Sequence, residues 1–202
     1  MVPVSLKLLV GLGNPGPEHS DTRHNAGFWF LDRLAANFNA TFTTDNRFFG
    51  QLARVQQNDI DCRLFKPQTY MNNSGRAVLS VANYFKILPE QILVAHDEID
   101  LPPGTVRLKQ GGGHAGHNGV RDIIDALGSR DFNRLRIGVG HPGNKEQVIG
   151  SVLGRPSRAD KKLIDDAIEQ ALELIPLLLA GEYARAMTQL HTSEKGKEES
   201  EK

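Results

Sequence analysis

The sequence predicts a single three-layer α/β domain, in which helices flank a twisted mixed β-sheet. Short apolar runs typical of buried strands alternate along the chain with segments whose apolar residues recur at helical spacing. The 202 residues are 39% hydrophobic, which is enough to bury one sizeable core. No internal repeat is visible, so a repeat architecture is not expected.

The first half of the chain predicts three strands and two helices. The strands are expected at Lys7–Val10, Phe48–Val55 and Ile60–Phe65, with a polar turn at residues 57–59 joining the last two. The helices are expected at Ala26–Phe38 and Ser74–Phe85, where apolar side chains repeat three and four residues apart.

The second half predicts three more strands and two helices. The strands are expected at Ile92–Ala95, running into His96 and Asp97, at Val106–Leu108 and at Leu135–Val139. The helices are expected at Asn118–Leu127 and, as one long amphipathic element, at Lys161–Leu190. Ser157 with Asp160 indicates an N-terminal cap, and Pro176 should kink the long helix or end its first half.

Composition limits the class of protein. Residues 1–191 are expected to form the folded domain, and the charged residues 192–202, which lack apolar anchors, are expected to be disordered. The single cysteine, Cys62, excludes an intrachain disulfide and fits a reducing compartment. Because no run of about 18 apolar residues and no signal-peptide pattern occurs, we expect a soluble cytoplasmic protein without membrane contact.

Two glycine-rich polar loops are the most unusual features. Residues 111–119 contain five glycines together with His114, His117 and Asn118. Residues 11–16 and 23–27 form a second cluster that also carries histidine and asparagine. Ordering so many glycines costs conformational entropy and adds nothing to a core, so such loops indicate close approach of a ligand. We expect the two loops to form the walls of one site.

Several familiar site types fit these loops poorly. Gly11-x-Gly13-x-x-Gly16 matches the dinucleotide fingerprint, but Pro15 and Pro17 would interrupt the helix that should hold the pyrophosphate. Neither loop is followed by a Walker A lysine. A metal site could use His96, Asp97, His114 and His117, yet these lie without a recognised ligand spacing, so no metal is expected.

A metal-free hydrolytic site fits better. His24 precedes a helix, and Asp97 follows a buried strand, whose carboxyl end is where α/β sheets usually bind ligands. A carboxylate that binds one imidazole nitrogen leaves the other free to take a proton from water. No Gly-x-Ser-x-Gly motif is present, so a serine nucleophile is disfavoured. Asn14, Asn72 and Asn118 could position a carbonyl or stabilise an oxyanion.

The loops also carry a family resemblance. The segments at 11–16, 22–27, 67–75, 96–104, 111–119 and 135–143 closely resemble, in order and spacing, those of bacterial peptidyl-tRNA hydrolase. That family cleaves the ester between a peptide and the 3′-terminal ribose of tRNA, and the resemblance implies this activity without a cofactor. It also implies an α/β catalytic domain, and we expect a monomer.

The resemblance implies roles for individual residues. His24 matches the general base, Asp97 its supporting carboxylate, and Asn14 the position that distinguishes N-blocked from free aminoacyl groups. Further substrate contacts are expected at His19, Tyr70, Met71, Asn72, His117 and Asn118. The family commonly has a tyrosine where this chain has His19.

Local charge suggests where tRNA would bind. Lys plus Arg equals Asp plus Glu over the whole chain, but residues 103–162 contain eleven basic and five acidic side chains. Arg107, Lys109 and Arg134 flank the His117 loop and are expected to contact phosphates of the acceptor arm. An ordinary solvated basic face, an RNA-binding module without chemistry and a metal-dependent hydrolase remain as alternatives.

Overall fold

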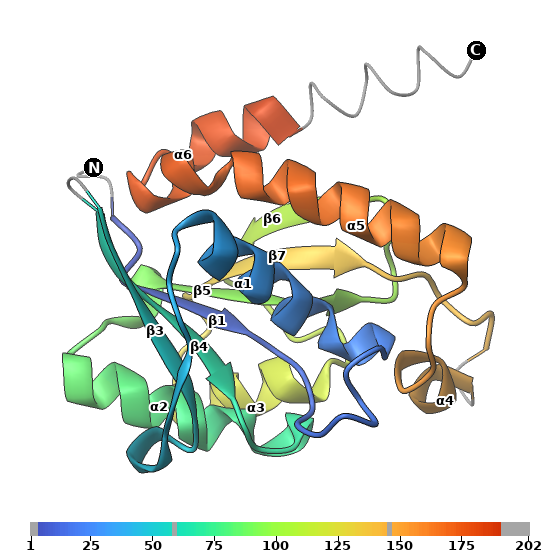
Figure 1. Cartoon of the computed structure of the whole chain (residues 1–202), viewed down its shortest axis with the longest axis horizontal. Coiled ribbons are helices and arrows are strands. Elements are labelled where there is room, and N and C mark those ends of the chain that lie inside the picture. The colour runs from blue at the N-terminus through green and yellow to red at the C-terminus, as the bar shows by residue number, and fades with distance from the viewer. Residues whose placement is uncertain (1–3, 58–59, 145–146, 191–202) are drawn as a thin grey trace.

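A computed structural model shows one seven-stranded mixed sheet running through the molecule (Figure 1). The structure describes residues 4–57, 60–144 and 147–190. The strands are β1 (Leu8–Gly11), β2 (Thr43–Asp45), β3 (Gly50–Gln57), β4 (Ile60–Pro67), β5 (Ile92–Glu98), β6 (Val106–Gln110) and β7 (Asn133–Gly138). Their order is β2-β3-β4-β1-β5-β7-β6. The four central strands β4, β1, β5 and β7 are parallel, whereas β2–β3, β3–β4 and β6–β7 pair antiparallel.

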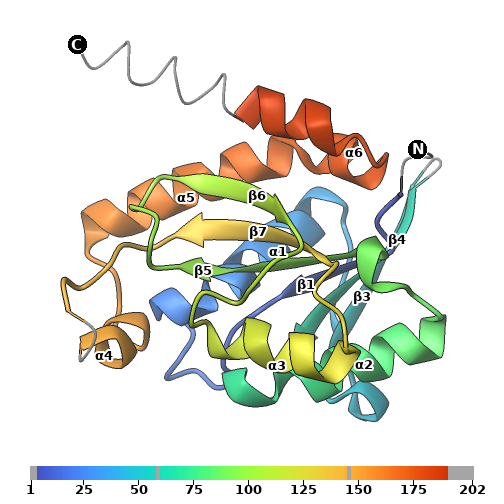
Figure 2. The same cartoon turned by 180° about the vertical axis from the view of Figure 1, so that it is seen from behind.

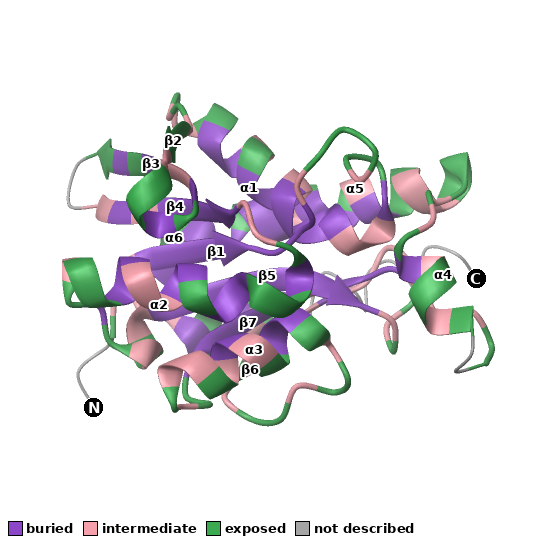
Figure 3. Cartoon of the chain, turned by 90° about the horizontal axis from the view of Figure 1, so that it is seen from below, coloured by how far each residue is buried: buried purple, intermediate pink, exposed green. Residues whose placement is uncertain are grey.

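Helices cover both faces of the sheet, as the three-layer prediction requires. On one face lie α1 (Ala26–Asn37), α5 (Arg158–Glu173) and α6 (Ile175–Leu179); on the other lie α2 (Ser74–Phe85) and α3 (Asn118–Leu127) (Figures 1 and 2). The short α4 (Val148–Val152) lies beyond the carboxyl ends of the central strands. Viewed from below, the buried strands run between the two helical layers (Figure 3).

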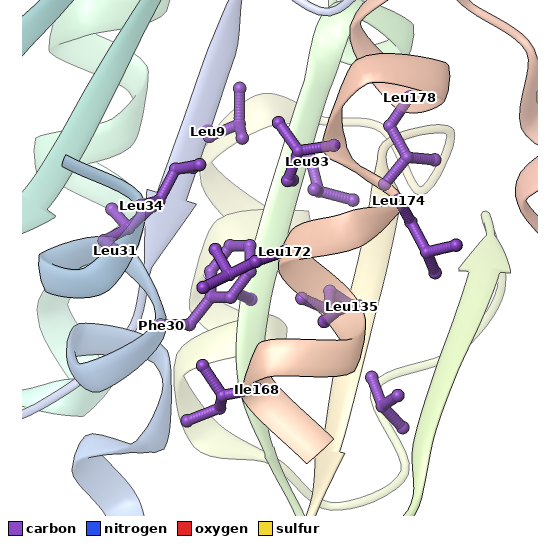
Figure 4. Packing of buried hydrophobic residues seen from close by; sticks show 14 of the residues in the cluster. Leu9, Phe30, Leu31, Leu34, Leu93, Leu135, Ile168, Leu172, Leu174 and Leu178 are labelled. Atoms are coloured by element: carbon purple, nitrogen blue, oxygen red, sulfur yellow. The ribbon is translucent and has the colours of Figure 1, made fainter. Parts of the chain in front are cut away.

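Alternating residues of the central strands divide the core into two clusters. Leu93 and Ala95 of β5 pack toward α1 and α5, while Ile92 and Val94 pack toward α2 and α3. Figure 4 shows Phe30, Leu31 and Leu34 of α1 meeting the strand side chains and Ile168 and Leu172 of α5 in the first cluster. This double burial explains why the central strands are continuous apolar runs.

The predicted elements are largely confirmed, but some need correction; the strand expected from Phe48, for example, begins at Gly50. The bounds of α2 and α3 agree, but β5 extends through His96 and Asp97 to Glu98. The sequence analysis missed β2 and α4, which are only three and five residues long. The charged residues 192–202, and residues 58–59 of the expected turn, lie outside the described residues.

The prediction of one helix over Lys161–Leu190 is wrong. Helix α5 already begins at Arg158 and ends at Glu173, α6 spans Ile175–Leu179, and residues 183–190 form a further helical segment. Pro176 is the second residue of α6, where its missing N–H does no harm. A positive φ of 78° at Gly181 then turns the chain before the last segment. No helix among the described residues is long and apolar enough to cross a membrane.

Close packing brings the loops after the parallel strands together at one end of the sheet. Gly27 in the first turn of α1 lies against β1 and β5, and a Cβ there would meet the Ala95 carbonyl oxygen at 2.3 Å. Only glycine allows α1 to approach the strands this closely. The turn Arg23–Asn25 before α1 and the last residues of β5 therefore lie close together.

Candidate active site

Two histidines converge on one buried carboxylate at this end of the sheet. Nδ1 of His24 lies 2.8 and 3.0 Å from the two carboxylate oxygens of Asp97. Nε2 of His117 lies 2.9 Å from Oδ1 of the same carboxylate. Asp97 is only 2% exposed, and the two imidazole rings are 5.1 Å apart. The two glycine-rich loops thus do form opposite walls of one site.

The fold supplies these three side chains from three different elements. His24 lies in the 3₁₀ turn Arg23–Asn25 directly before α1, and Asp97 is the last residue but one of β5. His117 is the N-cap of α3, and its Nδ1 accepts a hydrogen bond from the Val120 N–H at 3.3 Å. Because Nδ1 accepts, the ring proton of neutral His117 is on Nε2, where it is donated to Asp97.

The same geometry determines the protonation of the cluster. Burial alone would raise the pKa of Asp97, but the two histidines hold it well below its usual value, so the carboxylate stays ionised. Burial opposes a charge on His24 as well, yet the attraction and hydrogen bond of Asp97 raise the pKa of that imidazole above 6.5. The neighbouring His96 is fully buried, and its pKa is lowered to about 3, so it is neutral.

Asn14 is held by two contacts that orient its side chain. Its Oδ1 accepts a hydrogen bond from the Met71 N–H at 2.8 Å. Its backbone is clamped by Asn25, whose amide side chain bonds both the N–H and the carbonyl of Asn14. With Oδ1 engaged, the NH₂ group of Asn14 is the part available to a ligand. Asn25 is a supporting residue that the sequence analysis did not identify, although it directly follows His24.

A cleft opens beside the His24–Asp97–His117 cluster. His24, His117 and the exposed Asn118 line it together with Ile99 and the α4 residues Val148, Ile149 and Val152. This apolar wall was not predicted from the sequence. The helical spacing of Val148, Ile149 and Val152 in an otherwise polar segment could have indicated it. Arg23 ties that segment to the site by donating to the carbonyl oxygens of Ser151 and Arg155.

Other expected site residues lie at the margin of this cleft or away from it. Met71 is buried against Asn14, whereas Asn72 and Tyr70 are exposed on either side of it in the chain. Tyr70 faces a separate hollow between α2 and α3 that Pro15 and Arg76 also line. His19 is partly exposed, and its Nε2 lies 3.8 Å from a carboxylate oxygen of Glu18. Within the described part of the chain its ring makes no hydrogen bond to His24, Asp97 or His117.

The basic residues divide into two groups. Arg107 and Lys109 are half-buried on the edge strand β6, paired in register with Arg136 and Arg134 of β7. Arg134, however, is only 2% exposed, and its guanidinium bonds the carbonyl oxygens of Gly112 and Gly113. The expectation that Arg134 contacts tRNA phosphates is therefore corrected: its side chain fastens the glycine loop to the sheet.

Comparison with known proteins identifies similar chains. The family model described as peptidyl-tRNA hydrolase matches residues 8–199. The peptidyl-tRNA hydrolase of Halorhodospira halophila is 57% identical over 185 residues, covering 92% of this chain and 95% of that protein. The peptidyl-tRNA hydrolase of one Pseudomonas putida strain is 53% identical over 189 residues, covering 93% of this chain and 97% of that protein.

Solved structures agree with this result. The crystal structure of peptidyl-tRNA hydrolase from Acinetobacter baumannii superimposes with a TM-score of 0.90 at 49% identity, covering 93% of this chain and 95% of that one. A complex of peptidyl-tRNA hydrolase with N-propanol gives a TM-score of 0.89 at 49% identity, covering 92% and 94%.

Proposed function

Because this chain belongs to the peptidyl-tRNA hydrolase family and hydrolyses peptidyl-tRNA, we propose that His24 is the general base that activates water for this reaction. The observation that carries the proposal is the contact of His24 Nδ1 with both oxygens of Asp97. This contact places the proton of neutral His24 on Nδ1. Nε2 then has a free lone pair at the cleft.

The reaction follows from this protonation state. His24 Nε2 takes a proton as a water molecule attacks the ester carbonyl, and the ionised Asp97 stabilises the imidazolium that forms. Donors such as the NH₂ groups of Asn14 and Asn118 stabilise the oxyanion of the tetrahedral intermediate. When this intermediate collapses, the ribose 3′-oxygen leaves and takes the proton back from His24. The products are free tRNA and a peptide with a carboxylate end.

The orientation of Asn14 supports a role in selecting N-blocked substrates. Since Oδ1 accepts from the Met71 N–H, the NH₂ group is the donor that Asn14 would offer to a substrate. A donor can bind the carbonyl oxygen of a peptide group, but it offers nothing to the ammonium of a free aminoacyl group, which loses hydration on entering. Tyr70, Met71, Asn72, His117 and Asn118 are proposed as further substrate contacts.

The half-buried Arg107 and Lys109 support docking of the acceptor arm, with the 3′ end directed to the cleft. Recognition through backbone phosphates and shape suits an enzyme that accepts many different tRNAs. His19 is retained as a proposed contact of the tRNA 3′ region. We also propose a cytoplasmic monomer, in line with the tRNA substrate; light scattering of the purified chain tests the oligomeric state.

Substitution of the catalytic pair tests the mechanism. His24→Ala is expected to lower kcat by roughly 10²–10⁴-fold with little change in substrate binding. Asp97→Asn is expected to act in the same direction, because a neutral amide cannot stabilise imidazolium. His114→Ala is the matched control, because His114 lies on the same loop as His117 but its ring accepts a hydrogen bond from the Gly116 N–H there. Near-normal turnover of both site variants would contradict the mechanism.

A metal-dependent hydrolase is the second candidate, because His24, Asp97 and His117 could together hold a metal ion. Chelation separates the two functions. Turnover of chelator-treated protein should continue, with Mg²⁺ kept constant for the tRNA. Loss of turnover that zinc restores would assign the histidines as ligands of a catalytic metal.

A further inference from the structure

We propose that His24, Asp97 and His117 also form a reversible inhibitory site for a divalent transition metal ion such as Zn²⁺. One ligand atom from each residue lies within 4.8 Å of the others. The three atoms are His24 Nδ1, a carboxylate oxygen of Asp97 and His117 Nε2, which already meet through contacts of 2.8 and 2.9 Å. Two imidazoles and a carboxylate with a fourth position open to a cleft are a common ligand set for zinc.

The spacing fits an ion after a small adjustment. Zinc lies about 2.0–2.1 Å from imidazole nitrogen, so neighbouring ligand atoms in a tetrahedral site are roughly 3.3 Å apart. The present contacts are slightly shorter than this, and the two nitrogens are at most 4.8 Å apart. The ion would therefore replace the protons through which His24 Nδ1 and His117 Nε2 now bond the Asp97 carboxylate.

Binding at this position would remove the catalytic base. A metal on Nδ1 of His24 displaces the proton from that nitrogen, and a neutral imidazole then carries its proton on Nε2. Nε2 would be a donor and could no longer accept a proton from water. The Nδ1–H bond of His24 breaks and an Nε2–H bond forms, with solvent water carrying the proton. The metal then occupies the vacated lone pair of Nδ1.

The surroundings of His117 indicate that such an ion is an inhibitor and not a resident cofactor. Metal-bound histidines usually donate their second N–H to a carbonyl or carboxylate. Here the second nitrogen, Nδ1, faces the Val120 N–H at 3.3 Å. If the proton moved to Nδ1 of His117, two N–H groups would point at each other and the N-cap hydrogen bond of α3 would be lost. Otherwise His117 would have to release the proton to solvent. We therefore expect moderate affinity and full reversal by chelators.

Few other ligands compete for the ion among the described residues. The only cysteine, Cys62, is buried, and its pKa is raised to about 12, so it offers no thiolate. His96 is buried with Nδ1 against the Asp97 carbonyl oxygen. His114 and His141 each bond a nearby backbone N–H in an exposed loop.

Cobalt binding tests the site without any assay of activity. Co²⁺ is added to chelator-treated protein, and the visible absorption bands of tetrahedral cobalt are followed. We expect one saturable site. His117→Asn removes a ligand but keeps a good N-cap for α3, so the variant should fold. It should weaken cobalt binding by at least about 10-fold. His114→Asn is the matched control, because asparagine can also accept the local backbone hydrogen bond; it should bind cobalt as the wild type does.

Absence of the absorption bands, or equal affinity in the His117→Asn and His114→Asn proteins, would overturn the site. A change of affinity confined to His117→Asn, accompanied by unchanged thermal unfolding of both variants, would establish it.

Inhibition, unlike binding, rests on the proposed role of His24. Hydrolysis of a minimal peptidyl-adenosine, which has no tRNA phosphates to bind the metal, should fall as Zn²⁺ fills the site and recover fully with EDTA. Activation by zinc would overturn the inference. Bound cobalt without inhibition would also overturn it and would in addition contradict His24 as base, a role that the metal-free His24→Ala assay tests independently.

Discussion

At the residue scale, one buried carboxylate gives its two histidines different tasks. Both rings donate to Asp97, but their outer nitrogens differ. His24 Nε2 faces the cleft, whereas His117 Nδ1 is occupied by the Val120 N–H at the start of α3. This difference supports the proposal that His24, and not His117, takes the proton from water. The assignment follows from backbone contacts and not from the types of the residues.

The raised pKa of His24 predicts a pH dependence. In the proposed mechanism the neutral imidazole is the base, so kcat/KM should rise with pH and level off above a midpoint higher than 6.5. Asp97 and His117 are the titratable groups that face this ring. In Asp97→Asn the attraction is lost while burial remains, so the residual activity should have a lower midpoint. A pH–rate profile of both proteins on a minimal substrate measures this; an unshifted midpoint would contradict it.

Asn14→Asp tests selection of the substrate. A carboxylate can still accept from the Met71 N–H, so the loop should keep its position, but the free donor is replaced by a negative charge. The ratio of turnover for N-blocked over free aminoacyl-tRNA should therefore fall. Asn73→Asp, an exposed change two residues beyond Met71, is the control. If the Asn14→Asp ratio equals that of the wild type, selection lies elsewhere in the cleft.

At the element scale, two glycines let helices approach their neighbours closely and so align the site. Gly27 lets α1 lie against β1 and β5, and Gly119 lets the first turn of α3 lie against Met71, where a Cβ would meet Sδ at 2.4 Å. These two helices carry the histidines from opposite faces of the sheet to Asp97. The side chain of Arg134 on β7 holds the glycine loop before α3 by donating to the carbonyl oxygens of Gly112 and Gly113.

The substitution Arg134→Ala should lower kcat whether or not the substrate contains a whole tRNA. The loop that leads to His117 and Asn118 would lose two charge-assisted hydrogen bonds and a side chain packed on Phe132. A small displacement of catalytic groups can cost roughly 10²-fold in rate. We expect kcat to fall by about 10–100-fold, equally on full-length and minimal substrates, together with a lower Tm.

Arg121→Ala, which changes an exposed arginine on α3, is the control for Arg134→Ala. It should leave kcat and Tm near the wild-type values. A loss seen only with full-length peptidyl-tRNA would return Arg134 to the phosphate contact that the sequence suggested.

At the scale of the whole molecule, basic side chains are concentrated in one region of the chain, although the formal net charge is zero. The formal net charge is +0, but the basic surplus of residues 103–162 gathers partly along the β6–β7 edge of the sheet. Arg136 in this group is paired with Glu98 at 2.9 Å, and Arg134 is buried. We propose Arg107 and Lys109, half-buried on the edge strand β6, as the phosphate contacts.

Salt dependence tests this surface. Because each phosphate contact releases condensed counterions, the double substitution Arg107→Ala with Lys109→Ala should raise KM for full-length peptidyl-tRNA and flatten its dependence on salt. Hydrolysis of a minimal peptidyl-adenosine should hardly change, since it has no acceptor stem. Rates for both substrates across a salt series provide the measurement. Equal losses on the two substrates would leave these side chains as ordinary solvated residues.

The sequence by itself determined the features that depend on neighbouring residues. Periodic apolar side chains predicted every strand of the sheet except β2, and also α1, α2 and α3, because burial of one face requires that spacing. The glycine loops and the position of Asp97 at the end of a strand predicted where the site lies. The motifs around His24 and Asn118 then indicated the family.

Only the tertiary structure decided the contacts between distant segments. His24 and Asp97 are 73 residues apart in the chain, and Asn14 and Met71 are 57 apart. No local pattern shows that Asn14 uses its oxygen for Met71, that His117 shares Asp97, or that Arg134 points inward beneath a loop. The wall from α4 and the turn at Gly181 after α6 were missed for the same reason. Their conformations are selected by packing against elements that are remote in sequence, and periodicity reports only on neighbours.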